Sequence, residues 1–233
     1  MKSQRSGCNK RFCFRANQSL QPTETAAELN DLNRLPVYGA RRSEMAKVIL
    51  DLCAGTGAWS MPYADAGYSV RLITLPEFDV RTYQPHERIH GVLAAPPCTD
   101  FTAACNRYWA DKDFDGRTFE SLGIVGACLR IIRQCKPKWW CLENPVGRLR
   151  RWIGPPVMYF HPYEYGDPYT KRTCLWGSFN KPVKNPVALT EEQRWQGKQN
   201  TRPLPSISKL TRRADLRAIT PAGFAQAFFE ANP

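Results

Sequence analysis

The fold of this chain is set by Val48-Ile-Leu-Asp-Leu-Cys-Ala-Gly-Thr-Gly-Ala-Trp-Ser60. Its first residues form an apolar run that is typical of a buried strand and closes on Asp51. Gly55 and Gly57 then open a turn into a helix expected to begin near Ala58. Glycines at such a turn let the backbone approach a ligand, and a helix start offers free N–H groups. Taken alone, the pair also suits an ordinary βα turn, because the third glycine of the dinucleotide fingerprint is absent.

A second apolar run ends in a rigid turn that carries a cysteine. Residues 90–102 read His-Gly-Val-Leu-Ala-Ala-Pro-Pro-Cys-Thr-Asp-Phe-Thr. Pro96 and Pro97 stop the strand and stiffen the backbone. Cys98 follows at the carboxyl end of the strand, where an open α/β sheet binds its ligands. A thiol held there is a candidate nucleophile, and the alternative is the small buried hydrophobe that a free cysteine usually is.

A third apolar run, Trp139-Trp-Cys-Leu-Glu-Asn-Pro145, ends in a carboxylate. Glu143 leaves a buried strand for the crevice of the sheet, where burial raises the pKa of a carboxyl group and suits it to proton donation. The alternative is a solvated or helix-capping glutamate.

Strands and helices alternate along the chain, which predicts an α/β fold with a mostly parallel sheet and helices on both faces. The expected strands are 46–52, 69–74, 90–95, 138–143, 156–160 and 172–178. The expected helices are 23–32, 58–66, 118–135 and 221–231, the last with Thr220 as N-cap and Pro221 at its first position. The loop 99–116 is long enough to be a lid.

Four segments are expected. Residues 1–45 form a basic arm with a short helix, and 46–180 form the catalytic core. Residues 181–210 are a linker or reduced recognition loop rich in Pro, Asn and Lys, and 211–233 complete the core with the last helix.

The chain is strongly basic, which indicates a nucleic-acid partner. Its 233 residues include 33 Lys and Arg against 21 Asp and Glu, a net charge of +12. Basic proteins are common, so the positions of the charges matter more than their sum. The expected nucleic-acid contacts are Arg107, Arg148, Arg150 and Arg151, and a second basic cluster comprises Lys209, Arg212, Arg213 and Arg217. Tyr108 and Trp109 lie beside Arg107, where an aromatic ring either replaces a displaced base or packs in the core.

The nine cysteines are expected to be free thiols in a cytoplasmic, reducing compartment. The basic, polar residues 1–15 do not resemble a signal peptide, and no apolar run is long enough to span a membrane. Cys8 and Cys13 lie close together, but no second pair has metal-ligand spacing, so we expect no metal. We expect a monomer.

In combination and order, these motifs resemble the cytosine-5 DNA methyltransferase family, and in particular its compact phage-borne members. The similarity covers about residues 46–180 and 211–232. The segments that carry it are Asp51–Gly57 (cofactor loop), Pro96–Cys98 (catalytic Pro-Cys), Glu143–Asn144 (Glu-Asn pair), Tyr169–Trp176 (arginine-rich strand) and Ile219–Asn232 (final motif).

The resemblance implies a Rossmann-like class I methyltransferase that uses S-adenosylmethionine to methylate cytosine C5 in DNA, as in restriction-modification, and it leaves protection, regulation and hypermodification open as roles of the product. It implies that Cys98 adds to the ring, that Glu143 acts as the acid at N3, and that Arg172 contacts the base. The cofactor-binding residues implied are Asp51, Cys53, Ala54, Gly55, Gly57, Glu77, Asp79 and Pro96. The target nucleotide must be flipped or arrive single-stranded, because its C5 and C6 atoms are inaccessible inside a duplex.

Several positions depart from the family. Phe179–Thr211 is too short for a recognition domain with its own core, so we expect relaxed or short sequence specificity. Pro145 replaces the usual valine, Cys174 stands where a second arginine is expected, and Glu77 substitutes for the usual strand-end acid. The alternatives are an enzyme that acts on RNA cytosine or transfers another group, and an inactive DNA-binding relative. The presence of both Cys98 and Glu143 argues against loss of activity.

Overall fold

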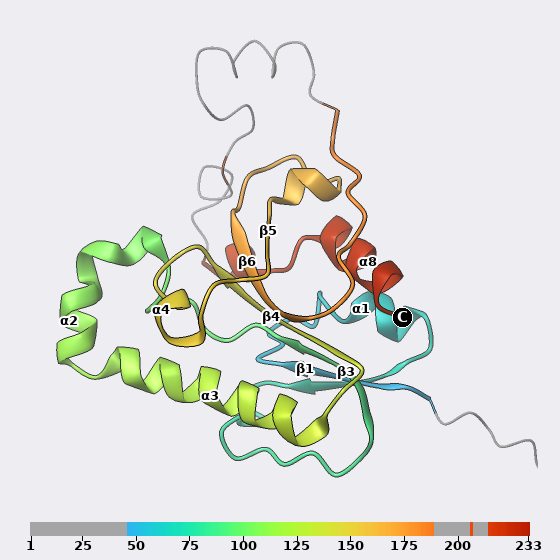
Figure 1. Ribbon diagram of the computed structural model, residues 1–233, viewed down its shortest axis with the longest axis horizontal. Helices are drawn as coiled ribbons and strands as arrows, with labels where there is room; N and C mark the ends of the chain where they lie inside the picture. The colour runs from blue at the N-terminus through green and yellow to red at the C-terminus, as the bar shows by residue number, and fades with distance from the viewer. Residues whose placement is uncertain (1–45, 189–205, 207–213) are drawn as a thin grey trace, which may run out of the picture. The chain divides into compact units, whose positions relative to one another are not determined.

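A mixed six-stranded sheet organises residues 46–188, 206 and 214–233, which are the residues described by a computed structural model (Figure 1). The strands are β1 (Val48–Leu52), β2 (Ser69–Ile73), β3 (Ile89–Ala94), β4 (Trp139–Pro145), β5 (Met158–Phe160) and β6 (Thr173–Ser178). They lie in the order β2-β1-β3-β4-β6-β5. The first four strands in this order pair in parallel, whereas β6 is antiparallel to β4 and β5. The six predicted strands are therefore confirmed.

Helices cover both faces of the sheet (Figure 1). They are α1 (Met61–Asp65), η2 (Ala103–Tyr108), α2 (Trp109–Phe114), α3 (Arg117–Cys135), α4 (Arg150–Ile153), η3 (Pro162–Tyr165), α7 (Ala214–Ala218) and α8 (Ala222–Ala231). One apolar cluster joins α3 to one face through Val125, Cys128 and Ile131. A second cluster joins Tyr63 of α1 and Phe224 of α8 to the other face. The predicted α/β class, a mostly parallel Rossmann-like sheet with helices on both faces, is confirmed.

The central strands are apolar on both faces because both faces are covered. All five residues of β1 are buried. At Gly91 in β3 the neighbouring strand comes so close that a Cβ atom would lie 2.2 Å from the Trp139 ring. The glycine is therefore a packing requirement of the β3–β4 pair, whose carboxyl ends carry Cys98 and Glu143.

Two predicted helix starts are wrong. Helix α8 begins at Ala222, and its N-cap is Pro221 rather than Thr220, because Pro221 has an extended ψ of 133°. The Asp167 carboxylate accepts a hydrogen bond from Gly223 N at 3.0 Å, so a distant side chain caps this helix. Helix α1 begins at Met61, three residues later than expected, because the turn before it extends to Ser60.

The segment 99–116 is not the irregular lid loop that we expected, since η2 and α2 occupy most of it. The predicted helix 23–32, Cys8, Cys13, Lys209, Arg212 and Arg213 lie outside the described residues. Within the described ranges, no helix has the length and apolar character needed to cross a bilayer. Among those same residues, no group of His, Cys, Asp and Glu side chains is arranged to hold a metal ion.

Candidate active site

The turn that carries Cys98 is held by hydrogen bonds on both sides of the cysteine. The carbonyl oxygen of Cys98 accepts from Phe101 N at 3.0 Å and from Thr102 N at 2.9 Å. Before the cysteine, the Asn144 side chain donates to the Pro96 carbonyl oxygen at 3.0 Å. The Glu-Asn pair of β4 therefore positions the Pro-Pro-Cys turn of β3 directly.

The loop after β4 closes over the turn after Cys98. Gly147 pairs with Thr102 in an isolated antiparallel bridge, and Arg148 N donates to Phe101 O at 2.8 Å. A Cβ atom at Gly147 would lie 1.9 Å from Phe101 O, so only glycine permits this approach. The sequence analysis missed Gly147, because its need arises from a contact between two loops.

Lys171 and Glu143 face each other beside the thiol. The Lys171 ammonium lies 3.8 Å from a Glu143 carboxylate oxygen, and the two side chains are 13% and 16% exposed. Burial raises the pKa of Glu143, as the sequence indicated, and Lys171 opposes that rise. Burial also raises the pKa of the Cys98 thiol, the Glu143 carboxylate raises it further, and Lys171 lowers it. The three groups therefore form one electrostatic unit.

Lys171 is the cation that sequence reasoning missed, whereas Arg172 points elsewhere. In the sheet register Glu143 pairs with Leu175, and Asn144 pairs with Cys174. Lys171 and Arg172 directly precede β6, and of these two residues Lys171 is the one that pairs with Glu143. Arg172 is exposed, and its guanidinium lies 4.8 Å from the centre of the Tyr159 ring. Contact of Arg172 with the base stays a prediction, and Tyr159 is its neighbour in the structure.

The glycine turn after β1 leaves backbone open to a ligand. Cys53, Gly55 and Gly57 have positive φ values of 56°, 56° and 72°. The turn is closed by a hydrogen bond of 2.9 Å from Gly57 N to Ala54 O. Gly55 is exposed, and a Cβ atom there would meet nothing within 4 Å. The surface beside Gly55 can therefore accept a group close to the main chain.

Two side chains of this loop face the interior rather than the open surface. The buried Asp51 carboxylate accepts a hydrogen bond of 2.6 Å from Ser60 Oγ, and burial raises the pKa of Asp51 to about 7. Asp51 thus anchors the residue before α1, which differs from the direct cofactor contact that we expected. The Cys128 thiol of α3 hydrogen-bonds to Cys53, which lowers the pKa of the Cys53 thiol.

The remaining expected cofactor residues lie after β2 and β3. Glu77 is exposed, and Pro96 is buried. The Asp79 carboxylate binds the Arg81 guanidinium at 2.6 Å and Arg81 N at 2.9 Å. These bonds hold the pKa of Asp79 below its usual range. A ligand amino group at Asp79 would share the carboxylate with Arg81, a partner that the sequence analysis did not consider.

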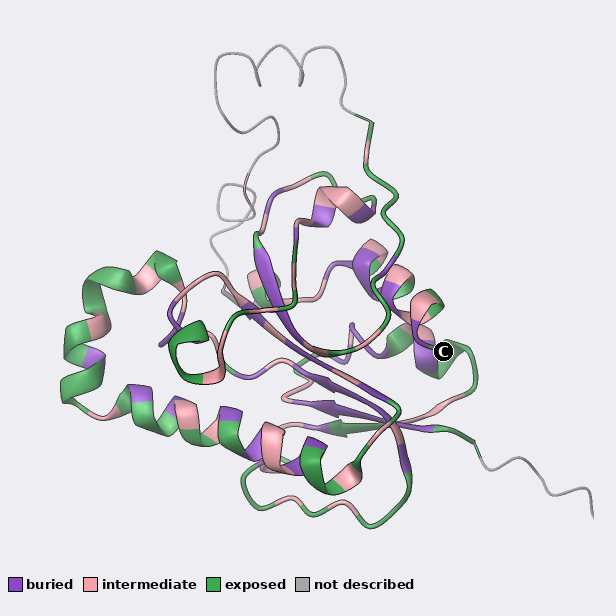
Figure 2. Cartoon of the chain, in the orientation of Figure 1, coloured by how far each residue is buried: buried purple, intermediate pink, exposed green. Residues whose placement is uncertain are grey.

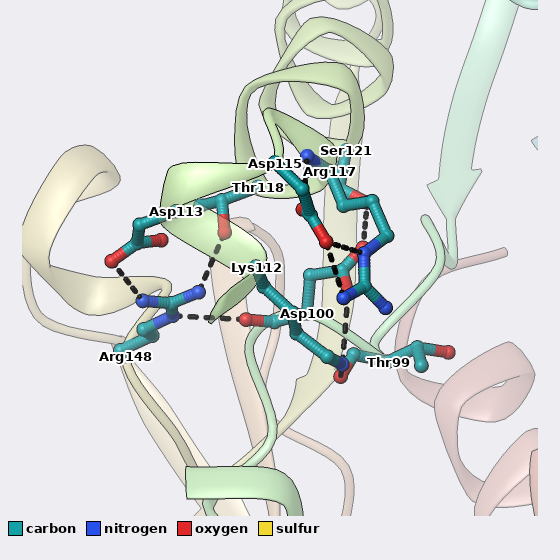
Figure 3. A network of polar contacts seen from close by, with 9 residues as sticks. All are labelled: Thr99, Asp100, Lys112, Asp113, Asp115, Arg117, Thr118, Ser121 and Arg148. Carbon is teal, nitrogen blue, oxygen red and sulfur yellow. Dashed lines mark hydrogen bonds and ion pairs between the residues drawn. The ribbon is translucent and has the colours of Figure 1, made fainter. Parts of the chain in front are cut away.

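Arg148 is a buried structural residue and not the exposed nucleic-acid contact that we expected. The residue is 3% exposed. Its guanidinium donates to Asp100 O at 2.9 Å, to Asp113 at 2.8 Å and to Thr118 Oγ1 at 2.6 Å (Figure 3). The loop after β4 is thereby fastened to the Cys98 turn, to α2 and to α3.

A second buried cation completes this network (Figure 3). Lys112 of α2 donates to Thr99 O at 2.6 Å and lies 2.9 Å from the Asp100 carboxylate. Ser121 of α3 donates to the same carboxylate at 2.5 Å. The Thr99 carbonyl oxygen is therefore bound by α2, and the Asp100 carboxylate is bound by both α2 and α3, close to Cys98. Of the four expected nucleic-acid contacts, Arg107, Arg150 and Arg151 are exposed.

No protein-family model matches the chain. No curated protein matches it in sequence. Among solved structures, the chain is similar to a protein assigned as a DNA modification methyltransferase encoded within an E. coli prophage, with 15% identity and a TM-score of 0.42 over 63% of this chain. It is also similar to the Entamoeba histolytica methyltransferase EhMeth, with 13% identity and a TM-score of 0.38 over 63% of this chain. The chain spans 54% and 57% of these two proteins.

Proposed function

We propose that the chain is a DNA cytosine-5 methyltransferase. The observation that carries this proposal is the coupling of a strand-end thiol, Cys98, to a buried carboxyl group, Glu143, beside an open glycine turn. Addition to a pyrimidine ring needs this pair, because C5 of cytosine is a poor nucleophile until the ring has been made electron-rich.

The chemistry assigns one step to each group. The Cys98 thiolate adds to C6 of cytosine, while protonated Glu143 donates to N3 and neutralises the charge that develops there. S-adenosylmethionine, when bound, supplies the methyl group that C5 then acquires. A base removes the proton from C5, the bond between Cys98 and C6 breaks, and Glu143 recovers its proton from N3. Cys98 leaves as the thiolate with which it began.

Cys98 and Glu143 share one negative charge opposite Lys171, and this sharing determines their protonation states. The coupled unit can hold this charge on Glu143 with a neutral thiol, or on Cys98 with a neutral carboxyl group. Burial raises the pKa of both groups, and the thiol starts from the higher value, so the charge rests on Glu143 until the thiol proton passes to this carboxylate and gives the reactive arrangement. Lys171 stabilises either anion, so it keeps the unit ionised while leaving the proton free to move between the two groups.

The residues around the glycine turn fit S-adenosylmethionine. Gly55 offers close approach to the backbone. Glu77 and Asp79 follow β2 and present carboxylates of the kind that accept hydrogen bonds from ribose hydroxyl groups and from an adenine amino group. These residues would hold the cofactor at the carboxyl ends of β1 and β2.

A covalent trap tests the proposal. The chain is incubated with S-adenosylmethionine and DNA in which 5-fluorocytosine replaces cytosine, and adducts are measured by mass spectrometry. Fluorine at C5 cannot leave as a proton does, so the bond to Cys98 should persist in the wild-type chain. Cys98→Ser should give no adduct, whereas Cys105→Ser, which alters another partly buried cysteine nearby, should still give one. An adduct in the Cys98→Ser chain would contradict the assignment.

The sequence context should be short, because Phe179–Thr211 replaces a recognition domain. Bisulfite sequencing of DNA from cells that express the chain should show methylation in a context of about one to three bases, since few side chains can reach base edges. Methylation confined to a long palindrome would mean that this segment or a partner protein reads the target.

A further inference from the structure

Three exposed aromatic rings lie against arginines on the side of the molecule that carries α4. We define the arginine–aromatic surface as Tyr108, Trp152 and Tyr159 with Arg107, Arg151 and Arg172. The rings are 44%, 43% and 39% exposed, respectively. Arg107 lies 4.6 Å from the centre of the Tyr108 ring, and Arg172 lies 4.8 Å from that of Tyr159. Figure 2 shows that α2 and α4 are largely exposed.

Contacts of the buried Arg148 join the segment that carries Tyr108 to the one that carries Trp152. The Arg148 guanidinium lies 4.9 Å from the centre of the Trp109 ring and 5.6 Å from that of Trp152. Arg151 lies 5.7 Å from the centre of the same Trp109 ring, and Tyr108 directly precedes Trp109. Trp152 and Trp109, the residue after Tyr108, therefore lie near the same buried guanidinium.

The surface adjoins the cysteine turn. The Trp152 ring packs edge-on against Phe101 at 5.9 Å, and Phe101 N binds the Cys98 carbonyl oxygen. Tyr159 lies opposite Cys174 in the sheet, and Arg172 O accepts a hydrogen bond from Val146 N at the end of β4. Direct contacts therefore join the surface to the turn after Cys98 and to the end of β4.

The arginines of the surface are available to an anion. Within the described residues, Arg107, Arg151 and Arg172 form no ion pair with a carboxylate. Asp113 interacts electrostatically with Arg151, but its carboxylate already binds Arg148. The surface thus combines open aromatic faces with uncompensated positive charge.

We propose that the arginine–aromatic surface binds an unpaired DNA strand, and that the enzyme therefore prefers single-stranded DNA to duplex. An exposed ring gains stacking energy only from a base whose face is open, and inside a duplex each face is covered by the next base pair. A surface that bound only phosphates would need the arginines but would not need exposed aromatic rings. Bases stack on Tyr108 and Trp152, and phosphates bind Arg107 and Arg151. This inference rests on the proposed function for the choice of DNA, but binding can be measured without methyl transfer.

Fluorescence anisotropy tests the stacking. The full chain is titrated into a labelled strand of about 12 nucleotides, a length in the range of known single-strand sites, and into the same strand in a duplex. Wild type should bind the strand more tightly than the duplex. Tyr108→Ala and Trp152→Ala should each weaken binding to the strand by about 5- to 150-fold, the range measured for removal of one stacking ring. Tyr108→Phe and Trp152→Phe keep a ring and should retain most of the affinity.

Salt dependence separates the arginines from the rings. Arg107→Ala and Arg151→Ala should each reduce the slope of log affinity against log salt by about 0.7 for a single strand. The ring variants should lose affinity at an unchanged slope. Arg133→Ala removes an equal charge from an exposed position near the end of α3 and should leave the slope unchanged.

The proposal is overturned if the duplex binds as tightly as the strand, or if removal of either ring leaves strand affinity intact. It is also overturned if ring removal weakens strand and duplex equally, because that result would indicate a general structural effect. Failure of the 5-fluorocytosine trap with normal ring-dependent binding would refute the methyl-transfer chemistry and leave this surface in place.

Discussion

Replacement of Arg148 by alanine should destabilise the fold far more than it affects contacts with DNA phosphates. The side chain is 3% exposed and makes three hydrogen bonds from its guanidinium, to Asp100 O, Asp113 and Thr118. A hydrogen bond that involves a charged group contributes about 1.5–3 kcal/mol, and the bond to Asp113 contributes less because that carboxylate is half exposed. Arg148→Ala should therefore cost about 3–5 kcal/mol, in the range found when one partner of a buried pair is removed.

In a domain of this size, 1 kcal/mol lowers the melting temperature by about 2–4 °C, so the expected fall is about 6–20 °C. Thermal unfolding followed by circular dichroism measures it. Arg151→Ala is the matched control, because it removes the same group from an exposed position three residues away and should change stability by less than about 0.5 kcal/mol. An Arg148→Ala chain with wild-type melting temperature and a reduced salt slope for DNA binding would show that the guanidinium faces solvent and contacts phosphate.

Three further substitutions address the supports of the site. Gly147→Ala places a Cβ atom 1.9 Å from Phe101 O, and this overpacking should lower the free energy of unfolding in urea by about 1–3 kcal/mol. Methyl transfer should also fall strongly, and normal activity would show that the two loops are free to separate. Lys171→Met removes the cation that lowers the pKa of the Cys98 thiol, so alkylation of Cys98 by iodoacetamide should shift to higher pH, and Lys171→Arg should keep the wild-type pH profile. An unshifted profile in the Met variant would show that Lys171 does not act on the thiol. Asp51 has a pKa of about 7 in the fold against an ordinary value of 3.8, so the unfolded chain loses this proton at lower pH than the folded chain does. The free energy of unfolding should therefore fall as pH rises from about 4 to 7, and urea unfolding across this range should show a smaller fall for Asp51→Asn.

The strands and the two reactive residues could be read from the sequence because both signals are local. A sheet covered on both faces needs continuous apolar runs, and each of the central runs β1, β3 and β4 is such a segment. Cys98 and Glu143 follow or end neighbouring parallel strands, so the topology alone brings them to one edge of the sheet.

Capping and burial depend on partners far along the chain, so they could not be read in the same way. The start of α8 follows from Asp167, which binds Gly223 N across a separation of 56 residues. Arg148 looks like its neighbours Arg150 and Arg151 in a basic cluster, and only its partners on α2 and α3 distinguish it. The approach of Lys171 to Glu143 likewise depends on the pairing of β4 with β6, which could not be read from the sequence.

The difference between Arg148 and its neighbours bears on how the site responds to DNA. The Arg148 Nε atom donates to the carbonyl oxygen of Asp100, two residues after Cys98. The guanidinium carbon of Arg148 lies 4.9 Å from the centre of the Trp109 ring and 5.6 Å from that of Trp152. A base that stacks on Trp152 therefore presses on a group already bonded to the cysteine turn. Under the proposed strand binding, a contact at Trp152 would therefore reach the Cys98 turn through Arg148, whose Nε atom donates to Asp100 O. Within this basic cluster, Arg148 is directed inward to the turn that carries Cys98, whereas the exposed Arg151 is one of the groups that we propose bind the DNA strand.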